Sequence, residues 1–229
     1  HAETRKKLVA AALEHAKTPS GAVGTEVRSD IDYDWVMPLT RMTPPYKTLG
    51  AMARETGKQP IDVLIDMALE KHLKMFFLTP VFNEDQEVVL QMMRHPRAAV
   101  TFSDSGAHVS QIMDASLQTH LLSHWVRDKQ AFTLEEAVKM LTCDNATQFG
   151  FHDRGLLREG MAADIVVFDP DTIAPRMPEV VTDLPAKAKR LRQKADGMRA
   201  TIVNGQVVLR DNEPTGNNPG RLLRRKRGG

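Results

Sequence analysis

The feature that most constrains the fold of this chain is a strand–helix–strand pattern in its middle third. Residues 74–79 and 98–103 are compact apolar runs, and the segment between them has helical spacing. We predict that its helix begins at Asn83, with Gln86 as capping-box partner, and stops before Pro96. Such a unit produces parallel strands that are covered on both faces, so the runs need no polar alternation. The pattern therefore predicts an α/β fold with a parallel sheet.

The second apolar run breaks into a polar loop, Ser103-Asp104-Ser105-Gly106-Ala107-His108. The loop that leaves the C-terminal end of a parallel strand is where ligands and catalytic groups collect. Asp104 is therefore a candidate catalytic residue. A second interpretation stays open, because an aspartate before Ser-Gly also caps ordinary turns.

Composition and charge exclude several classes of protein. The chain has 229 residues, 41% of them apolar, and its formal net charge of +2 is too small to indicate a nucleic-acid or acidic-membrane partner. No apolar run approaches the roughly 18 residues of a membrane span, and the first residues lack the apolar segment of a signal peptide. The single Cys143 allows neither an intrachain disulfide nor a Cys-x-x-Cys zinc site. We expect a cytoplasmic chain without nucleic-acid or membrane partners.

Helical spacing also occurs outside the central unit, in residues 3–16, 48–56, 60–72, 116–127 and 133–141. Gly57 is predicted to stop the second of these helices, Pro60 to start the third, and Thr133 to open the last with a capping box. His120 and His124 have the i, i+4 spacing of a helical metal pair. No glutamate follows His120 as a metalloprotease would need, so we interpret the pair as part of an ordinary packed or solvated face.

The composition shifts beyond residue 150 towards short β-rich runs. Residues 160–170 form a turn, a β-rich run and a proline stop, and residues 198–210 contain two such runs joined by Asn204-Gly205. Asn-Gly between two β runs is the strongest short-range hairpin signal. Residues 171–196 are rich in Pro, Lys and Asp and are interpreted as a loop. The sequence thus predicts a small β element after the α/β part, with a boundary after residue 150.

An ordered series of short motifs resembles the amidohydrolase superfamily. The series consists of Ser103-Asp104, Leu134-Glu135-Glu136-Ala137-Val138, Asn145-Ala146-Thr147-Gln148-Phe149-Gly150, Asp153-Arg154-Gly155, Glu159-Gly160, residues 162–170 and Val203-Asn204-Gly205. Within that superfamily it is most similar to the N-acyl-D-amino-acid deacylases, including the ending from Thr215-Gly216 to Pro219-Gly220-Arg221. The resemblance covers about residues 48–226.

The resemblance implies the C-terminal part of a metal-dependent (β/α)₈ TIM barrel over residues 1–150 and strands of a small β-sandwich over residues 151–229. Residues 74–79 and 98–103 are similar to its seventh and eighth strands. Asp104 would then be the eighth-strand aspartate, which lies at the metal and takes the proton of the metal-bound water. Zinc lowers the pKa of bound water to about 7, and a carboxylate beside it can pass the proton to a leaving amine.

The resemblance also implies which residues line the substrate pocket. Ser105, Gly106 and His108 follow the aspartate and are candidates for this lining. For His108, a structural hydrogen bond is an equally open interpretation.

The sequence departs from the family pattern in its metal ligands. Such enzymes carry a His-x-His pair after the first strand and further ligands near the fourth, fifth and sixth strands, and no such set is visible here. A catalytic zinc needs about three protein ligands, so we expect a C-terminal portion that is inactive alone and is completed by an N-terminal polypeptide carrying the histidines. The expected activity is zinc-dependent hydrolysis of a small-molecule N-acyl-D-amino acid. A cyclic-amide or dipeptide hydrolase and a noncatalytic scaffold chain remain as alternatives.

Overall fold

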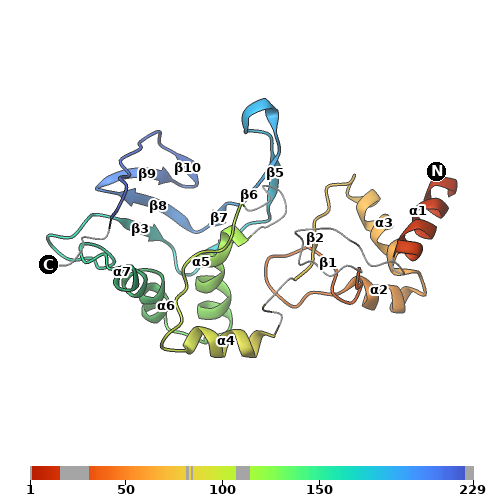
Figure 1. Ribbon diagram of the computed structural model, residues 1–229, viewed down its shortest axis with the longest axis horizontal. Helices are drawn as coiled ribbons and strands as arrows, with labels where there is room; N and C mark the ends of the chain where they lie inside the picture. Colours follow the sequence, from red (N-terminus) through yellow and green to blue (C-terminus); the bar gives the residue numbers. More distant parts are fainter. Residues whose placement is uncertain (1, 16–30, 81–82, 84, 107–113, 225–229) are drawn as a thin grey trace. The chain divides into compact units, whose positions relative to one another are not determined.

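The structure is a computed structural model that describes residues 2–15, 31–80, 83, 85–106 and 114–224 (Figure 1). The chain forms two compact units, His1–Val89 and Leu90–Gly229. The predicted boundary after residue 150 falls inside the second unit and stays a prediction. None of the helices in the described part of the chain combines the length and apolar character that crossing a membrane requires.

The first unit is a small helical cluster with one short strand pair. Its elements are α1 (Ala2–His15), β1 (Met37–Pro38), α2 (Leu49–Thr56), α3 (Pro60–Glu70) and β2 (Phe77–Leu78). Its core consists of Val36, Leu49, Ala53 and Val63, with Phe77 packed against them. Burial of these apolar side chains holds α2 and α3 against the strand pair.

Local signals set the helix ends of the first unit. The Thr48 hydroxyl accepts a hydrogen bond from the Ala51 backbone N–H at 3.1 Å, which caps the start of α2. Gly57 ends α2 in the left-handed conformation, with φ of 67°, and Pro60 is the first residue of α3. The predicted stop at Gly57 and start at Pro60 are both confirmed.

The chain passes from the first unit to the second within α4 (Gln86–Arg94). This helix is capped by Asp85, whose Oδ1 accepts from the backbone N–H groups of Glu87 at 2.9 Å and Val88 at 3.2 Å. The prediction that the helix begins at Asn83 was therefore wrong. A carboxylate two residues later satisfies the free N–H groups, and Asn83 takes a left-handed φ of 61°.

Helices and short strands make up the second unit. The helices are η1 (Asp114–Ser116), α5 (Leu117–His120), the π-helix η2 (Leu121–Asp128), α6 (Leu134–Leu141), α7 (Cys143–Phe149) and η3 (Pro185–Lys187). The strands are β3 (Ile165–Phe168), β4 (Ala174–Pro175), β5 (Glu179–Val181), β6 (Arg190–Arg192), β7 (Ala195–Asp196), β8 (Met198–Val203), β9 (Gln206–Arg210) and β10 (Glu213–Pro214). The predicted capping box at Thr133 is confirmed.

The main sheet of the second unit has the strand order β10-β9-β8-β3, and all its pairs are antiparallel. Asn204 and Gly205, with φ of 46° and 77°, form the turn between β8 and β9, as the sequence predicts. The segment 171–196 was expected to be a loop, yet it contributes the antiparallel pairs β4–β7 and β5–β6. That prediction was wrong because pairing partners far along the chain outweigh a turn-rich composition.

The predicted parallel strand–helix–strand unit is absent from the described residues. Residues 74–79 provide only the two-residue strand β2, which pairs antiparallel with β1, and residues 98–103 form no strand. An apolar run becomes a strand only when a neighbour supplies hydrogen bonds, and here the Val100 carbonyl accepts from the Asn145 side chain at 2.6 Å instead. The chain has mixed α and β elements, while the barrel and the β-sandwich stay predictions.

Two histidines lie in the interior of the second unit. The rings of His120 and His124 are stacked with centroids 4.8 Å apart, and His124 is only 2% exposed. The buried Nε2 of His124 has no hydrogen-bond partner among the described residues. The interpretation of this pair as a packed face is confirmed for His124, and both rings are best accommodated as neutral imidazoles.

Alanine substitutions at Gly155 and Gly160 can test how closely the loop after α7 packs against that helix. Both are left-handed, with φ of 88° and 82°, so alanine at either site carries a backbone strain of about 1–2 kcal/mol. Only at Gly155 would the new methyl lie 2.8 Å from the Ala146 Cβ, whereas nothing lies within 4 Å at Gly160. We expect Gly155→Ala to lower the free energy of unfolding, measured in urea, by about 1–3 kcal/mol more than Gly160→Ala. Equal losses would contradict the close packing.

A pH dependence follows from His120. Burial, helped by the positive charge of His124 and opposed by Asp128, lowers the pKa of His120 from about 6.5 to about 4. Between these values the unfolded chain binds more protons, so the free energy of unfolding should fall as the pH drops from about 6.5 to about 4. In His120→Gln this fall should be shallower by up to about 1.4 kcal/mol per pH unit in urea unfolding. The exposed His152→Gln is the control, and identical slopes in the two variants would contradict the assignment.

Candidate functional site

Asp104 lies in a tight turn that directly follows residues 98–103. Its backbone is left-handed, with φ of 56°, and its side chain is exposed. The Ser103 hydroxyl accepts a hydrogen bond from the Ser105 backbone N–H at 3.2 Å, so Ser103 makes the side-chain contact that stabilises the turn. The Asp104 carboxylate makes no hydrogen bond or ion pair with any residue that the structure describes. The turn-capping interpretation of Asp104 therefore finds no support in this geometry.

The conformation of Asp104 is itself informative. A left-handed backbone is uncommon outside glycine, and aspartate is among the few residues that adopt it. Such conformations cluster at functional sites, where the surrounding structure holds them in place. Nine other non-glycine residues in the described part of the chain, Asp211 among them, share this conformation, so the turn alone does not distinguish a chemical role.

The other predicted pocket residues follow Asp104 directly. Ser105 and Gly106 are exposed, and Gly106 is left-handed with φ of 88° and open space where a side chain would lie. His108 lies outside the described residues. Asp104, Ser105 and Gly106 are brought together by their sequence adjacency, and their role in lining a substrate pocket stays a prediction.

The sequence motifs that follow Asp104 form a connected set of contacts around Arg154. The Arg154 guanidinium contacts Asp153 at 3.1 Å and is also paired with Asp164. The Asp164 carboxylate accepts a second hydrogen bond from the Asn204 backbone N–H at 2.8 Å, at the turn between β8 and β9. Asp153, more than Asp164, raises the pKa of Arg154 above its ordinary value, so this cation is permanent. We call Arg154, Asp164 and Asn204 the arginine clasp.

The sequence does not predict the arginine clasp, because Arg154, Asp164 and Asn204 belong to three separate motifs. A signal did exist, since Asp153-Arg154-Gly155 places a cation next to a glycine that the chain needs for close approach. The Gly155 Cα lies so near α7 that a Cβ would be 3.1 Å from the Cys143 Cα. The clasp and the adjacent Gly155 thus link α7 to the β8–β9 turn.

The described residues do not supply a zinc site by themselves. They contain no group of three or more His, Cys, Asp or Glu side chains that could hold a metal ion. Asp104 is the predicted ligand that they include, and one carboxylate falls short of the about three protein ligands of a catalytic zinc. We therefore derive no chemical step through zinc from this geometry.

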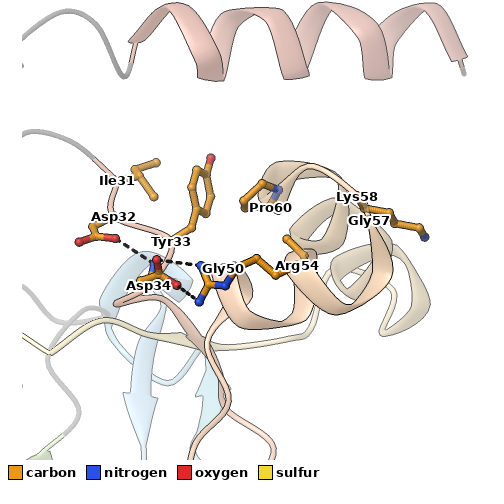
Figure 2. Close-up of a pocket in the computed structure, with 10 residues that line it drawn as sticks. Ile31, Asp32, Tyr33, Asp34, Gly50, Arg54, Gly57, Lys58 and Pro60 are labelled. Atoms are coloured by element: carbon orange, nitrogen blue, oxygen red, sulfur yellow. Dashed lines mark hydrogen bonds and ion pairs between the residues drawn. The ribbon is translucent and has the colours of Figure 1, made fainter.

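A separate hollow of about 550 Å³ opens in the first unit (Figure 2). Arg54 reaches across it and donates to both carboxylate oxygens of Asp34, at 3.1 and 2.8 Å. This contact holds the pKa of Asp34 below its ordinary value. A Cβ at Gly50 would lie 2.2 Å from the Asp34 Oδ1, so a larger residue there would displace this carboxylate. Asp34 and Arg54 pair with each other and Lys58 pairs with Asp66, so we assign the hollow no chemical role.

Comparison with known proteins connects this geometry to a family. The sequence profile of the amidohydrolase family matches residues 1–209. An N-acyl-D-glutamate deacylase of Alcaligenes xylosoxydans xylosoxydans is 39% identical over 107 residues, which cover 47% of this chain and 20% of that protein. An N-acyl-D-aspartate deacylase of the same organism is 32% identical over 177 residues, which cover 73% of this chain and 33% of that protein.

One solved structure is similar at the level of the backbone. It is an N-acyl-D-glutamate deacylase from Bordetella bronchiseptica, complexed with zinc and a phosphonate inhibitor that mimics the tetrahedral intermediate of the reaction. The TM-score is 0.50 at 28% identity, and the match covers 83% of this chain and 37% of that one. The chain spans about a fifth to a third of the length of these two curated relatives.

The family match includes the turn at Asp104 and every member of the arginine clasp. The relatives of this chain include N-acyl-D-amino-acid deacylases, as the motif series indicates. The resemblance is therefore confirmed, and this chain belongs to the amidohydrolase family.

Proposed function

We propose that this chain is part of a hydrolase that cleaves the amide bond of N-acyl-D-amino acids. The observation that carries the proposal is Asp104, an exposed carboxylate in a left-handed turn that Ser103 stabilises. The family membership supports a hydrolase, and the names of the relatives support the class of substrate.

Asp104 acts as the proton acceptor in this proposal. A water oxygen bonds to the amide carbonyl carbon while Asp104 takes a proton from that water. The carbon–nitrogen bond then breaks, and Asp104 returns the proton to the leaving amine, so that the products are a carboxylic acid and a free amino acid. A positioned acid–base group of this kind contributes typically 10²- to 10⁴-fold to the rate. Ser105, Gly106 and His108 line the substrate pocket beside it.

The proposal includes zinc and a larger polypeptide. Asp104 is the one ligand that we assign to the described residues, and the remaining ligands are histidines that an N-terminal polypeptide supplies. The zinc named in the Bordetella bronchiseptica structure supports the metal in this proposal. The complete enzyme would then have the (β/α)₈ barrel with a β-sandwich, divided in this chain after residue 150. A cytoplasmic location is part of the same proposal.

Replacing Asp104 by asparagine tests its chemical role. Asparagine tolerates the left-handed backbone as aspartate does, so folding should be unaffected, but an amide cannot accept the proton. In the complete enzyme that carries this chain, we expect Asp104→Asn to lower kcat by about 10²-fold or more. The matched control is Asp211→Asn, since Asp211 is also exposed and left-handed, with φ of 47°. Normal turnover in Asp104→Asn would show that the assignment is wrong.

The substrate class is tested by stereochemistry. We expect N-acyl-D-amino acids to be cleaved with a higher kcat/KM than their L enantiomers, measured by release of the free amino acid. The panel should contain acidic and apolar side chains, because the two curated relatives act on different acidic residues by name. Equal rates for the enantiomers, or activity confined to cyclic amides, would favour a different hydrolase of the family.

A further inference from the structure

We infer that Asn145 is a positioning residue for Asp104, because its side-chain amide holds the segment that leads into the Asp104 turn. The inference rests on the proposed role of Asp104 and adds a residue to it. Asn145 lies on α7, 45 residues from the Val100 carbonyl that it contacts. The contact therefore joins two parts of the second unit that local structure does not bring together.

The orientation of the Asn145 amide is fixed by its surroundings. Its Nδ2 donates to the Val100 carbonyl at 2.6 Å and lies 3.5 Å from the Leu141 carbonyl. Turning the amide over would place Oδ1 against these two carbonyl oxygens, and two acceptors repel each other. The donor therefore faces the Asp104 segment.

Within the part of the chain that the structure describes, the Asp104 segment has little else to hold it. Residues 98–103 form no strand, the Ala98 N–H bonds within a turn to the His95 carbonyl, and the Ser103–Ser105 contact is local. Among the residues that the structure describes, Asn145 makes the one hydrogen bond that reaches residues 98–106 from outside this stretch and its preceding turn. Val100 is half-buried, so without Asn145 its carbonyl would depend on water for a partner.

The helix that carries Asn145 is itself held firmly. Its next residue, Ala146, is buried, and the Gly155 backbone closes on it so tightly that a Cβ would lie 2.8 Å from the Ala146 Cβ. The Phe151 N–H also donates to the Ala146 carbonyl at 2.8 Å, which closes the end of α7. The position of Asn145, and through it that of Val100, is thereby set by the packing of α7.

The carbonyl oxygen of the Asn145 side chain shows why aspartate could not replace asparagine at this position. The Oδ1 of Asn145 is buried without a hydrogen-bond partner among the described residues, so the contact seen depends on the donor alone. Aspartate has nearly the same shape but cannot donate, and it would place a charged acceptor against the Val100 carbonyl. A carboxylate in the first turn of a helix is otherwise favourable, so Asn145→Asp should leave α7 formed.

The test compares Asn145→Asp with Asn212→Asp in the complete enzyme that carries this chain. Asn212 also donates through Nδ2 to a backbone carbonyl, that of Ala195, at 2.7 Å, but it lies in the β part of the unit. We expect Asn145→Asp to lower kcat by about 10- to 100-fold with KM little changed, because a displaced catalytic group affects the chemical step. Asn212→Asp should keep both values.

Two further measurements separate positioning from stability. Amide hydrogen exchange at residues 101–106 should accelerate in Asn145→Asp and not in Asn212→Asp. In the Asp104→Asn background, Asn145→Asp should cause no additional loss of kcat, because both changes remove the same contribution. Asn145→Ala provides a second variant without the charge, since alanine favours the helix.

Each outcome decides something. Unchanged exchange at residues 101–106 in both Asn145 variants would overturn the inference whatever the activity. Faster exchange with normal kcat would also overturn it, as would a full additional loss in the Asp104→Asn background. If Asp104→Asn itself keeps normal turnover, the proposed function fails, and the exchange result then reports only on the contact between Asn145 and Val100.

Discussion

The arginine clasp is the interaction on which the arrangement of the second unit depends. The Arg154 and Asp164 side chains are only 16% and 29% exposed, so their charges are partly removed from water. Burying an ion pair is costly unless the remaining donors and acceptors are satisfied, and here Asp153 and the Asn204 backbone N–H satisfy them. By contrast, the pair between Arg176 and Asp196 is about half exposed on both sides and is worth little. The clasp can therefore fix the β8–β9 turn relative to α7.

The second unit also contains a buried polar side chain, His124, that forms no ion pair with the residues that the structure describes. The Nε2 of His124 lacks a partner among the described residues, and its ring stacks on His120. Burial lowers the pKa of both rings, which keeps them neutral near pH 7. Arg154 thus stays charged because hydrogen-bonding partners surround it. His120 and His124 are neutral because burial disfavours their charged forms.

The sequence predicted those features that neighbouring residues decide. Gly57, Pro60, the Thr133 capping box and the Asn204-Gly205 turn each act over a few residues, and the structure has them as expected. The start of α4 was misplaced because Asn83 and Asp85 are both capable caps, and only the three-dimensional structure shows which one meets the free N–H groups. Residues 98–103 look like a strand in sequence, but strand formation depends on a distant partner.

In the candidate site, too, the sequence indicates features that depend on neighbouring residues and misses contacts between distant ones. Its place after an apolar run makes Asp104 a candidate, and the motif series indicates the family. The contact between Asn145 and Val100 could not be identified, because no pattern in a single sequence joins residues 45 positions apart. The arginine clasp was likewise visible only as separate motifs until their side chains were placed together.

Two independent constraints meet at residue 104. The left-handed backbone, with φ of 56°, is one that glycine, asparagine and aspartate adopt with the least strain. Proton transfer to a leaving amine requires a group that gains and loses a proton, and of these three residues only aspartate has one. If the turn alone were needed, any of the three would serve. An aspartate at residue 104, beside the turn contact of Ser103, therefore permits the proposed proton transfer, which glycine or asparagine would not.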